Sequence, residues 1–259
     1  MRPTFLRVPA TRRFARLGVA LLLLTLVLPL LPTPVALAAP TCVVTNLNDS
    51  NAGSLRQCLT DIDSGGTITF QAGLTGTIAP ATALPTLTKA VTVIGPGANL
   101  LSIDPTFVGF PGGAFIVDNG GNLTVSGLTL TGATNGVYIL PGGIGSLTNM
   151  DISNNLNVGV FAEDSSATLR NVTLSGNDTG LRVSGNGNAN LGNVTISGNF
   201  VGVENEDNGA AILSNVTLRG NNVGLFNLAG STQLTNTIVA DSTTTNCSTW
   251  NSRTCARPS

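Results

Sequence analysis

A six-residue pattern returns along the chain at nearly constant spacing, and this repeat restricts the fold more than any other feature of the sequence. In each copy, apolar residues alternate with other types, which is the period of a strand and not of a helix. The copies begin at Val125, Leu147, Leu169, Leu191, Leu213 and Leu234, so the spacing is 22 residues four times and then 21. The chain is therefore expected to contain a series of similar strand-rich units.

A second alternating element follows each of the first five copies. Its copies begin at Gly136, Gly159, Gly180, Gly202 and Gly224. Each unit is thus two or three short strands joined by turns, and no unit can bury its apolar face alone. Stacking the units about 4.8 Å apart closes an interior column of Val, Leu and Ile. The repeat predicts an all-β solenoid of parallel coils, each about 22 residues long.

Asparagine recurs with the same spacing in two series. One series is Asn155, Asn177, Asn199 and Asn221, and the other is Asn149, Asn171, Asn193 and Asn215. Stacked asparagines hydrogen-bond from one coil to the next, and they tolerate the left-handed backbone of sharp corners. The Asn-Val-Thr sequences also match a glycosylation signal, but a ladder asparagine facing its neighbours leaves no room for a sugar. We therefore expect asparagine ladders at two corners of the coil.

Residues 1–38 have the composition of a secretory signal peptide. Five arginines without an acidic residue precede an apolar run from Leu17 to Leu31, and Ala36-Leu37-Ala38 follows. The alternative is a retained anchor, but this run is shorter than the roughly 20 residues that span a bilayer. We expect cleavage after Ala38, a mature chain without a membrane span, and a secreted, extracellular or cell-surface location.

Charge and composition restrict the classes of partner and of fold that are expected for the mature part. Removing five arginines leaves seven basic and thirteen acidic residues, a net charge of −6, which argues against nucleic acid as a partner. The chain has no histidine, one tyrosine and one tryptophan. Many short strands and turns fit this composition better than helical domains do. We expect a monomer.

Four cysteines form two local pairs, Cys42 with Cys58 and Cys247 with Cys255. An even number in an exported chain indicates disulfides, and the pairs lie near the two ends of the mature part. A zinc site is the alternative, but there is no C-x-x-C spacing and no histidine to support it.

The repeat over residues 65 to 240 resembles the right-handed parallel β-helix family, the architecture of pectate lyases and many bacterial surface proteins. Residues 44–50 and 53–59 resemble the N-terminal cap called the CSLREA region, except that Cys58 follows Ser-Leu-Arg instead of preceding it. The expected parts are a cap (39–66), a right-handed β-helix (67–246) and a C-terminal tail with a disulfide loop (247–259).

Ser54 is placed to cap a short helix whose Leu55, Leu59 and Ile62 cover the end of the apolar column. Gly65-Gly66 is expected to stop this helix. Trp250 is expected at the far end.

The resemblance also implies an activity to look for. Enzymes of this family act on polysaccharide with clustered Asp residues that hold calcium and a nearby Arg or Lys as base, or with paired acids. The strand alternation places two columns of side chains on the outside. They are Thr129, Asp151, Thr173, Thr195 and Thr217, and Tyr138, Phe161, Arg182, Glu204 and Phe226. Ice binding by the threonine column would need a broad flat array, whereas this column is one threonine wide and interrupted by Asp151.

The candidate catalytic residues are Asp151, Arg182 and Glu204, with Arg170 as a further basic residue. Asp151 is a lone carboxylate in its column. Arg182 and Glu204 fall on adjacent coils, so an exposed ion pair explains them as well as catalysis does.

The candidate metal ligands are Glu163 with Asp164, and Glu206 with Asp207, in loops two coils apart. Their oxygens are of the kind that calcium takes, and solvated loop acids are the alternative. No other cofactor is expected.

The candidate binding residues are the aromatic members of the second column, Tyr138, Phe161 and Phe226. Exposed rings on a regular face stack on sugars or meet another protein, unless loops fold over them. We therefore favour a non-catalytic module that binds carbohydrate or a surface protein. The alternative is a polysaccharide lyase or glycoside hydrolase acting on an acidic polysaccharide.

Overall fold

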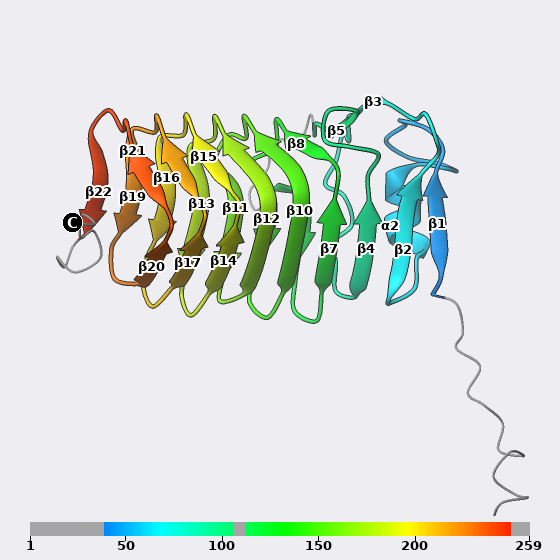
Figure 1. Ribbon diagram of the computed structural model, residues 1–259. Coiled ribbons are helices and arrows are strands. Elements are labelled where there is room, and N and C mark those ends of the chain that lie inside the picture. Colours follow the sequence, from blue (N-terminus) through cyan, green and yellow to red (C-terminus); the bar gives the residue numbers. More distant parts are fainter. Residues whose placement is uncertain (1–38, 106–111, 250–259) are drawn as a thin grey trace, which may run out of the picture. The chain divides into compact units, whose positions relative to one another are not determined.

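The computed structural model describes residues 39–105 and 112–249, and the strands there form a parallel β-solenoid of about nine turns (Figure 1). This confirms the predicted fold class. The expected signal peptide, Trp250 and Cys255 lie outside the described residues, so the bridge from Cys247 to Cys255 stays a prediction. In the described part, no helix combines the length and the apolar character that crossing a bilayer requires.

Each complete coil contributes strands to three faces, and within each face the strands pair in parallel. Face 1, toward the viewer in Figure 1, consists of β1 (Thr41–Val44), β2 (Gly66–Phe70), β4 (Ala90–Ile94), β7 (Asn122–Ser126), β10 (Ile144–Ser153), β12 (Ser166–Ser175), β14 (Asn188–Gly192), β17 (Ala210–Ser214) and β20 (Ser231–Thr235). The second halves of β10 and β12 bend into face 2, which also contains β3 (Gly76–Ile78), β5 (Leu101–Ile103), β8 (Thr129–Thr131), β15 (Thr195–Ser197), β18 (Thr217–Arg219) and β21 (Ile238–Ala240).

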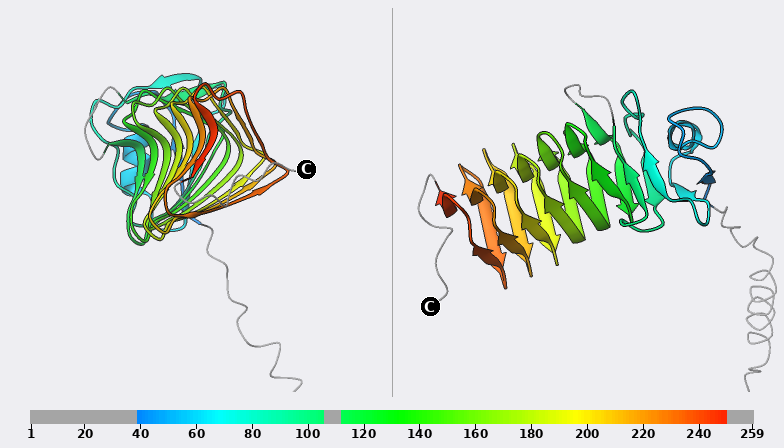
Figure 2. Two further views of the ribbon diagram at one scale, coloured as in Figure 1. Left: turned by 90° about the vertical axis from the view of Figure 1, so that its left-hand side faces the viewer. Right: turned by 90° about the horizontal axis from the view of Figure 1, so that it is seen from above.

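Face 3 is a separate seven-stranded sheet. Its strands are β6 (Gly113–Val117), β9 (Asn135–Ile139), β11 (Val158–Glu163), β13 (Thr179–Ser184), β16 (Val201–Asn205), β19 (Val223–Asn227) and β22 (Thr245–Thr249). Figure 2 shows the coils from the end and from above, where successive strands of one face lie side by side.

The register of the coils is the one that the repeat predicts. Leu147 pairs with Leu169, Leu169 with Leu191, and Leu191 with Leu213. These four side chains are fully buried. The interior is therefore a continuous apolar column along the stack, in which each leucine contacts its counterparts on the adjacent coils.

The two predicted asparagine ladders are confirmed, and they mark two different corners. At the bend between faces 1 and 2, Asn149, Asn171, Asn193 and Asn215 have φ of 54° to 56°, and their side chains are exposed. Left-handed backbone of this kind is tolerated by asparagine better than by most residues. Asn171 Nδ2 donates to Asn149 Oδ1 at 3.1 Å, and Asn193 Nδ2 donates to Asn171 Oδ1 at 3.3 Å.

The other ladder is buried at the corner between faces 2 and 3. Asn155 Nδ2 donates to Asn177 Oδ1 at 2.9 Å, Asn177 to Asn199 at 3.1 Å, and Asn199 to Asn221 at 3.0 Å. The second residue of strands β9, β11, β13 and β16 is a glycine that packs against this ladder. A Cβ on Gly159 would lie 2.6 Å from the Gly180 carbonyl oxygen and 3.1 Å from Asn177 Nδ2, so only glycine fits there.

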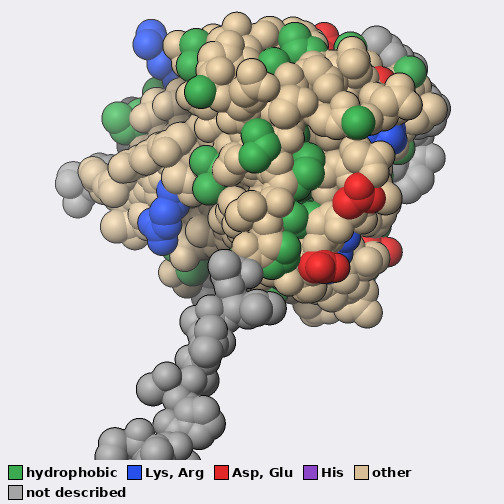
Figure 3. Space-filling model, turned by 90° about the vertical axis from the view of Figure 1, so that its right-hand side faces the viewer, with side chains coloured by type: hydrophobic (Ala, Val, Ile, Leu, Met, Phe, Trp, Pro, Cys, Tyr) green, Lys and Arg blue, Asp and Glu red, His purple; other side chains and the backbone are tan. Residues whose placement is uncertain are grey.

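The N-terminal end is closed by a short helix, α2 (Leu55–Asp61). Ser54 Oγ accepts a hydrogen bond from the Gln57 amide at 3.1 Å, as expected of an N-cap. Leu55, Leu59 and Ile62 are buried. Figure 3 looks onto this end, where polar and backbone atoms surround small groups of hydrophobic side chains.

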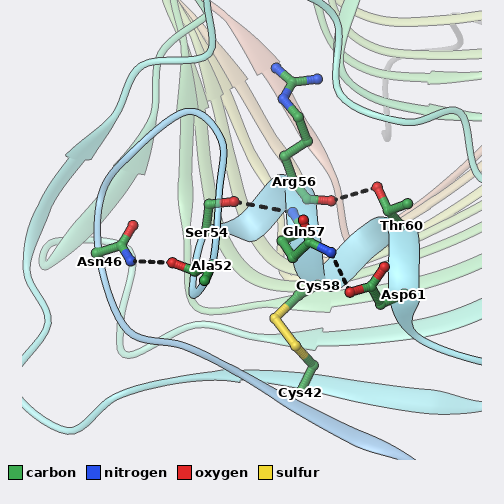
Figure 4. The surroundings of a disulfide bond; sticks show 9 residues. All are labelled: Cys42, Asn46, Ala52, Ser54, Arg56, Gln57, Cys58, Thr60 and Asp61. Atoms are coloured by element: carbon green, nitrogen blue, oxygen red, sulfur yellow. Dashed lines mark hydrogen bonds between the residues drawn. A yellow bond between two sulfur atoms is a disulfide. The ribbon is translucent and has the colours of Figure 1, made fainter.

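The Cys42–Cys58 disulfide ties α2 to the first strand (Figure 4). That strand, β1, was not foreseen: it pairs with β2 from Thr41 to Val44 and so adds a strand to face 1 within the segment assigned to the cap. Arg56 joins the cap to a later loop, because its guanidinium donates to the Thr82 carbonyl at 2.8 Å and pairs with Asp49.

Candidate functional site

The outward column of face 3 is assembled as the strand alternation predicts. Tyr138 pairs with Phe161, Phe161 with Arg182, Arg182 with Glu204, and Glu204 with Phe226. Three aromatic and two charged side chains therefore stand on five successive coils, in strands β9 to β19.

The rings at one end of this column are stacked but covered. The Tyr138 and Phe161 centroids are 4.8 Å apart, with 3° between the ring planes. Only 5% of Tyr138 and 9% of Phe161 is exposed. Val158 is buried in the same cluster, and Leu140 packs against it. The expectation of exposed rings is wrong for these two residues, because an outward position in a strand does not guarantee exposure when apolar neighbours flank it.

Arg182 links the rings to the acids of the next coil. Its Cζ lies 5.5 Å from the Phe161 centroid, within the range of a cation–π contact. Its Nε donates to Glu206 Oε1 at 2.8 Å and lies 3.3 Å from Glu204 Oε2. Burial opposes the charge of Arg182, but the hydrogen bond to Glu206 and the nearby carboxylates raise its pKa above the ordinary value. Within residues 39–105 and 112–249, the two terminal nitrogens of this guanidinium have no hydrogen-bond partner.

Glu204 is the acid with an altered proton affinity. Its side chain is 17% exposed. Burial raises the pKa of Glu204 above the ordinary value, and the charge of Arg182 opposes this shift only in part. Acids of this kind are found at functional sites and in structural ion pairs alike.

The four loop acids each have a different environment, and they do not assemble into a metal site. Tyr138 Oη donates to Glu163 Oε2, which increases the proton affinity of the phenol: burial and this hydrogen bond raise the pKa of Tyr138. Asp164 Oδ1 accepts from the Asn186 amide at 2.8 Å, and Glu206 pairs with Arg182. Asp207 is exposed. In the described part of the chain, no three acidic or sulfur side chains are grouped to hold a metal ion.

The candidate catalytic residues lie on different faces. Asp151 belongs to the face 2 half of β10, between Thr129 and Thr173, whereas Arg182 and Glu204 belong to face 3. Asp151 Oδ1 is buried without a hydrogen-bond partner among the described residues. Arg170 is exposed on face 1. Asp151 and Arg170 are therefore not brought together with the ion pair of face 3.

Two further residues of this surface were not singled out from the sequence. Ser184 pairs with Glu163 one coil later and is the next outward residue after Arg182, which was a signal available in the alternation. Val158 is fully buried beside the stacked rings. Val158 lies on the same side of β11 as Phe161, although the two residues are three positions apart in the sequence. The alternation of inward and outward side chains is therefore interrupted at Gly159. Phe226 is half-buried and separated from the stacked rings by Arg182 and Glu204.

Comparison with known proteins places this site on a familiar architecture. A family model described as "right handed beta helix region" matches residues 113–256. The solved structure of ORF18 of Geobacillus virus E2 has a TM-score of 0.54 and 12% identity, over 82% of this chain and 46% of that chain. The chain thus spans about half the length of that viral protein.

Two other solved structures are more distant in shape. Pectate lyase Pel9A has a TM-score of 0.47 and 14% identity, over 74% of this chain and 69% of that chain. The Agl-KA catalytic domain has a TM-score of 0.44 and 18% identity, over 72% of this chain and 46% of that chain. No curated protein matches the sequence. Identities this low show a shared fold and carry no activity across.

Proposed function

We propose that this chain, which belongs to the family of right-handed β-helix regions, is an exported, non-catalytic module. In this proposal it binds carbohydrate through the outer surface of face 3. The fold by itself hosts many unrelated functions, so the proposal depends on the surface around Arg182. The arrangement of that guanidinium is the observation that carries it.

Arg182 is held in place from two sides and still has hydrogen-bonding capacity. Phe161 supports the guanidinium from one coil, and Glu204 and Glu206 hold it from the next. Its terminal nitrogens are unpartnered in the part of the chain that the structure describes, and the carboxylates beside it are acceptors. Fixed donors next to acceptors suit the hydroxyl groups of a sugar, which both donate and accept. A preorganised side chain also loses little entropy on binding.

The partnered state of the acids favours binding over catalysis. Glycosidases need one carboxyl group that gives up a proton and a second one free to act on water or on the sugar. Here Glu206 and Glu204 are engaged by Arg182, and Glu163 by Tyr138.

The same proposal includes export, cleavage after Ala38 and the likeness of the cap to the CSLREA region. They agree with the disulfide between Cys42 and Cys58, since disulfides persist in oxidising compartments.

A panel of neutral and acidic polysaccharides tests the proposal by affinity electrophoresis or pull-down. Arg182→Ala removes the donor of face 3, and Arg170→Ala is the matched control, because Arg170 is an exposed arginine on another face. We expect retention by one polysaccharide class that Arg182→Ala abolishes and Arg170→Ala does not change. Retention that survives Arg182→Ala would remove face 3 as the binding surface, and binding of proteins alone would replace carbohydrate as the partner.

A polysaccharide lyase or glycoside hydrolase is the second candidate, and the raised pKa of Glu204 favours it. A carboxyl group that keeps its proton to higher pH suits a general acid. Release of new reducing ends or unsaturated products from any polysaccharide of the panel, lost in Glu204→Gln, would establish this function in place of the first.

A further inference from the structure

Face 1 carries an ordered array of hydroxyl groups that is independent of the face 3 site. Two outward columns run along strands β2, β4, β7, β10 and β12, two residues apart in each strand. The first column is Thr67, Thr92, Thr124, Ser146 and Thr168, and the second is Thr69, Ile94, Ser126, Thr148 and Arg170. Eight of these ten positions are threonine or serine, and we call them the hydroxyl array.

The register makes the hydroxyl array regular in two directions. Parallel in-register pairing places corresponding side chains about 4.8 Å apart along the stack, and residues two apart in a strand are about 6.6 Å apart across it. The five strands lie side by side in Figure 1. Threonine adds to this order because its branched Cβ restricts the side chain to few rotamers.

The hydroxyls of the array are free to bond outside the protein. Within residues 39–105 and 112–249, none of the eight has a hydrogen-bond partner in the chain. The hydroxyls at the start of face 2 differ: Thr77 Oγ1 and Ser102 Oγ bond to each other at 2.8 Å, and Thr129 Oγ1 donates to the Ala98 carbonyl. The hydroxyls of the array therefore keep their hydrogen-bonding capacity for a partner outside the chain.

The array is also uncharged, although the mature chain carries a net charge of −6. Arg170 is the one charged member of the two columns, and it lies at their margin. Protein interfaces are enriched in aromatic residues, and the array has none. Its complement is a neutral surface that presents donors and acceptors with a two-dimensional repeat.

We propose that the hydroxyl array of face 1 binds ice. Each water molecule at an ice surface both donates and accepts hydrogen bonds, as each threonine hydroxyl does, and its lattice repeats in two dimensions without charge. A column one threonine wide would not match such a lattice, but two parallel columns across five coils offer a surface that does. This function uses a different face from the carbohydrate site and does not depend on it.

Retention of the purified mature chain in slowly growing ice tests the proposal, with thermal hysteresis as a second measurement. The test variant is Thr124→Lys with Ser146→Lys, at the centre of the array. Ile212→Lys is the matched control, because Ile212 continues the first column beyond the array and is also exposed. We expect the double variant to be excluded from ice, while Ile212→Lys and Arg182→Ala are retained like the unchanged protein.

Circular dichroism of each variant confirms that the solenoid is intact before the comparison is made. Three results would overturn the proposal. They are exclusion of the unchanged protein from ice, equal loss in Ile212→Lys and the double variant, and retention by a neutral crystalline polysaccharide without retention in ice.

Discussion

The Tyr138 ring lies flat against the Phe161 ring, with 4.8 Å between centroids, although the two residues belong to different coils. The phenol hydroxyl donates to Glu163, and Arg182 covers the other end of the pair. Since Tyr138 is the one tyrosine in the sequence, its ionisation can be followed without interference from other tyrosines.

We expect Tyr138 to ionise well above the ordinary tyrosine pKa of about 10, because burial, the hydrogen bond to Glu163 and its charge all raise the pKa. The folded state then holds the phenol proton more tightly than the unfolded state. The resulting stability is complete below about pH 10 and is lost as the pH rises through the folded pKa. Ultraviolet absorbance of the phenolate measures this titration. Glu163→Gln should lower the pKa only in part, and a native titration at the ordinary value would contradict the structure.

We expect Asn177→Ala to lower the free energy of unfolding by about 3 kcal/mol, since each buried polar group left without a partner costs about 1–3 kcal/mol. Asn177 Oδ1 accepts from both the backbone amide and the side chain of Asn155, and its Nδ2 donates to the Ile152 carbonyl.

The control is Asn171→Gly on the exposed ladder, where glycine keeps the positive φ of 54° and removes the two side-chain bonds, to Asn149 and from Asn193. It should cost less than about 1 kcal/mol, because water replaces the lost bonds. Denaturant unfolding measures both, and equal losses would refute the difference between the two ladders.

We expect Cys42→Ala with Cys58→Ala to destabilise the N-terminal end by about 3 kcal/mol, the amount expected for a loop of this size. The bridge closes a separation of 16 residues and joins β1 to α2. Hydrogen exchange should become faster in β1 and α2 first and least in β16 and β19, which lie far along the stack. Uniform acceleration in all coils would show that the solenoid unfolds as one unit.

We expect Glu204 to make stability fall as the pH rises from its ordinary pKa, about 4.3, toward neutrality. Its raised pKa means that the folded state binds this proton more tightly than the unfolded state, so the contribution is present at low pH and lost through the folded pKa. Glu204→Gln should flatten the slope of stability against pH, while Arg182 keeps its hydrogen bond to Glu206. If the slope is unchanged in Glu204→Gln, the pH dependence of stability comes from other groups.

The repeat allowed the register and the corners to be predicted. The burial of individual outward side chains could not be predicted, because it depends on local packing. The pairing of Leu147 with Leu169 and the ladder from Asn155 follow from spacing alone, because parallel in-register stacking brings equivalent residues together. The column from Tyr138 to Phe226 follows from alternation. The burial of Tyr138 does not, since it depends on Val158 and Leu140, whose contacts are set by the coil shape.

The hydroxyl array was missed for a different reason. In the first coils the spacing is irregular, so Thr67, Thr92 and Thr124 are not related by the 22-residue repeat. Only the strand pairing shows that they share a column. The threonine column that the repeat did predict, from Thr129 to Thr217, is in register as expected.

The buried asparagine ladder restricts how a chain of this kind can become longer or shorter during evolution. Asn177 and Asn199 each donate to the next coil the same side-chain hydrogen bond that they accept from the coil before. Excision of residues 177–198 would bring Asn155 opposite Asn199 with an identical partner, whereas loss of a single residue would leave every later amide out of step. Gene duplication and deletion in whole coils therefore offer evolution a route to longer or shorter forms.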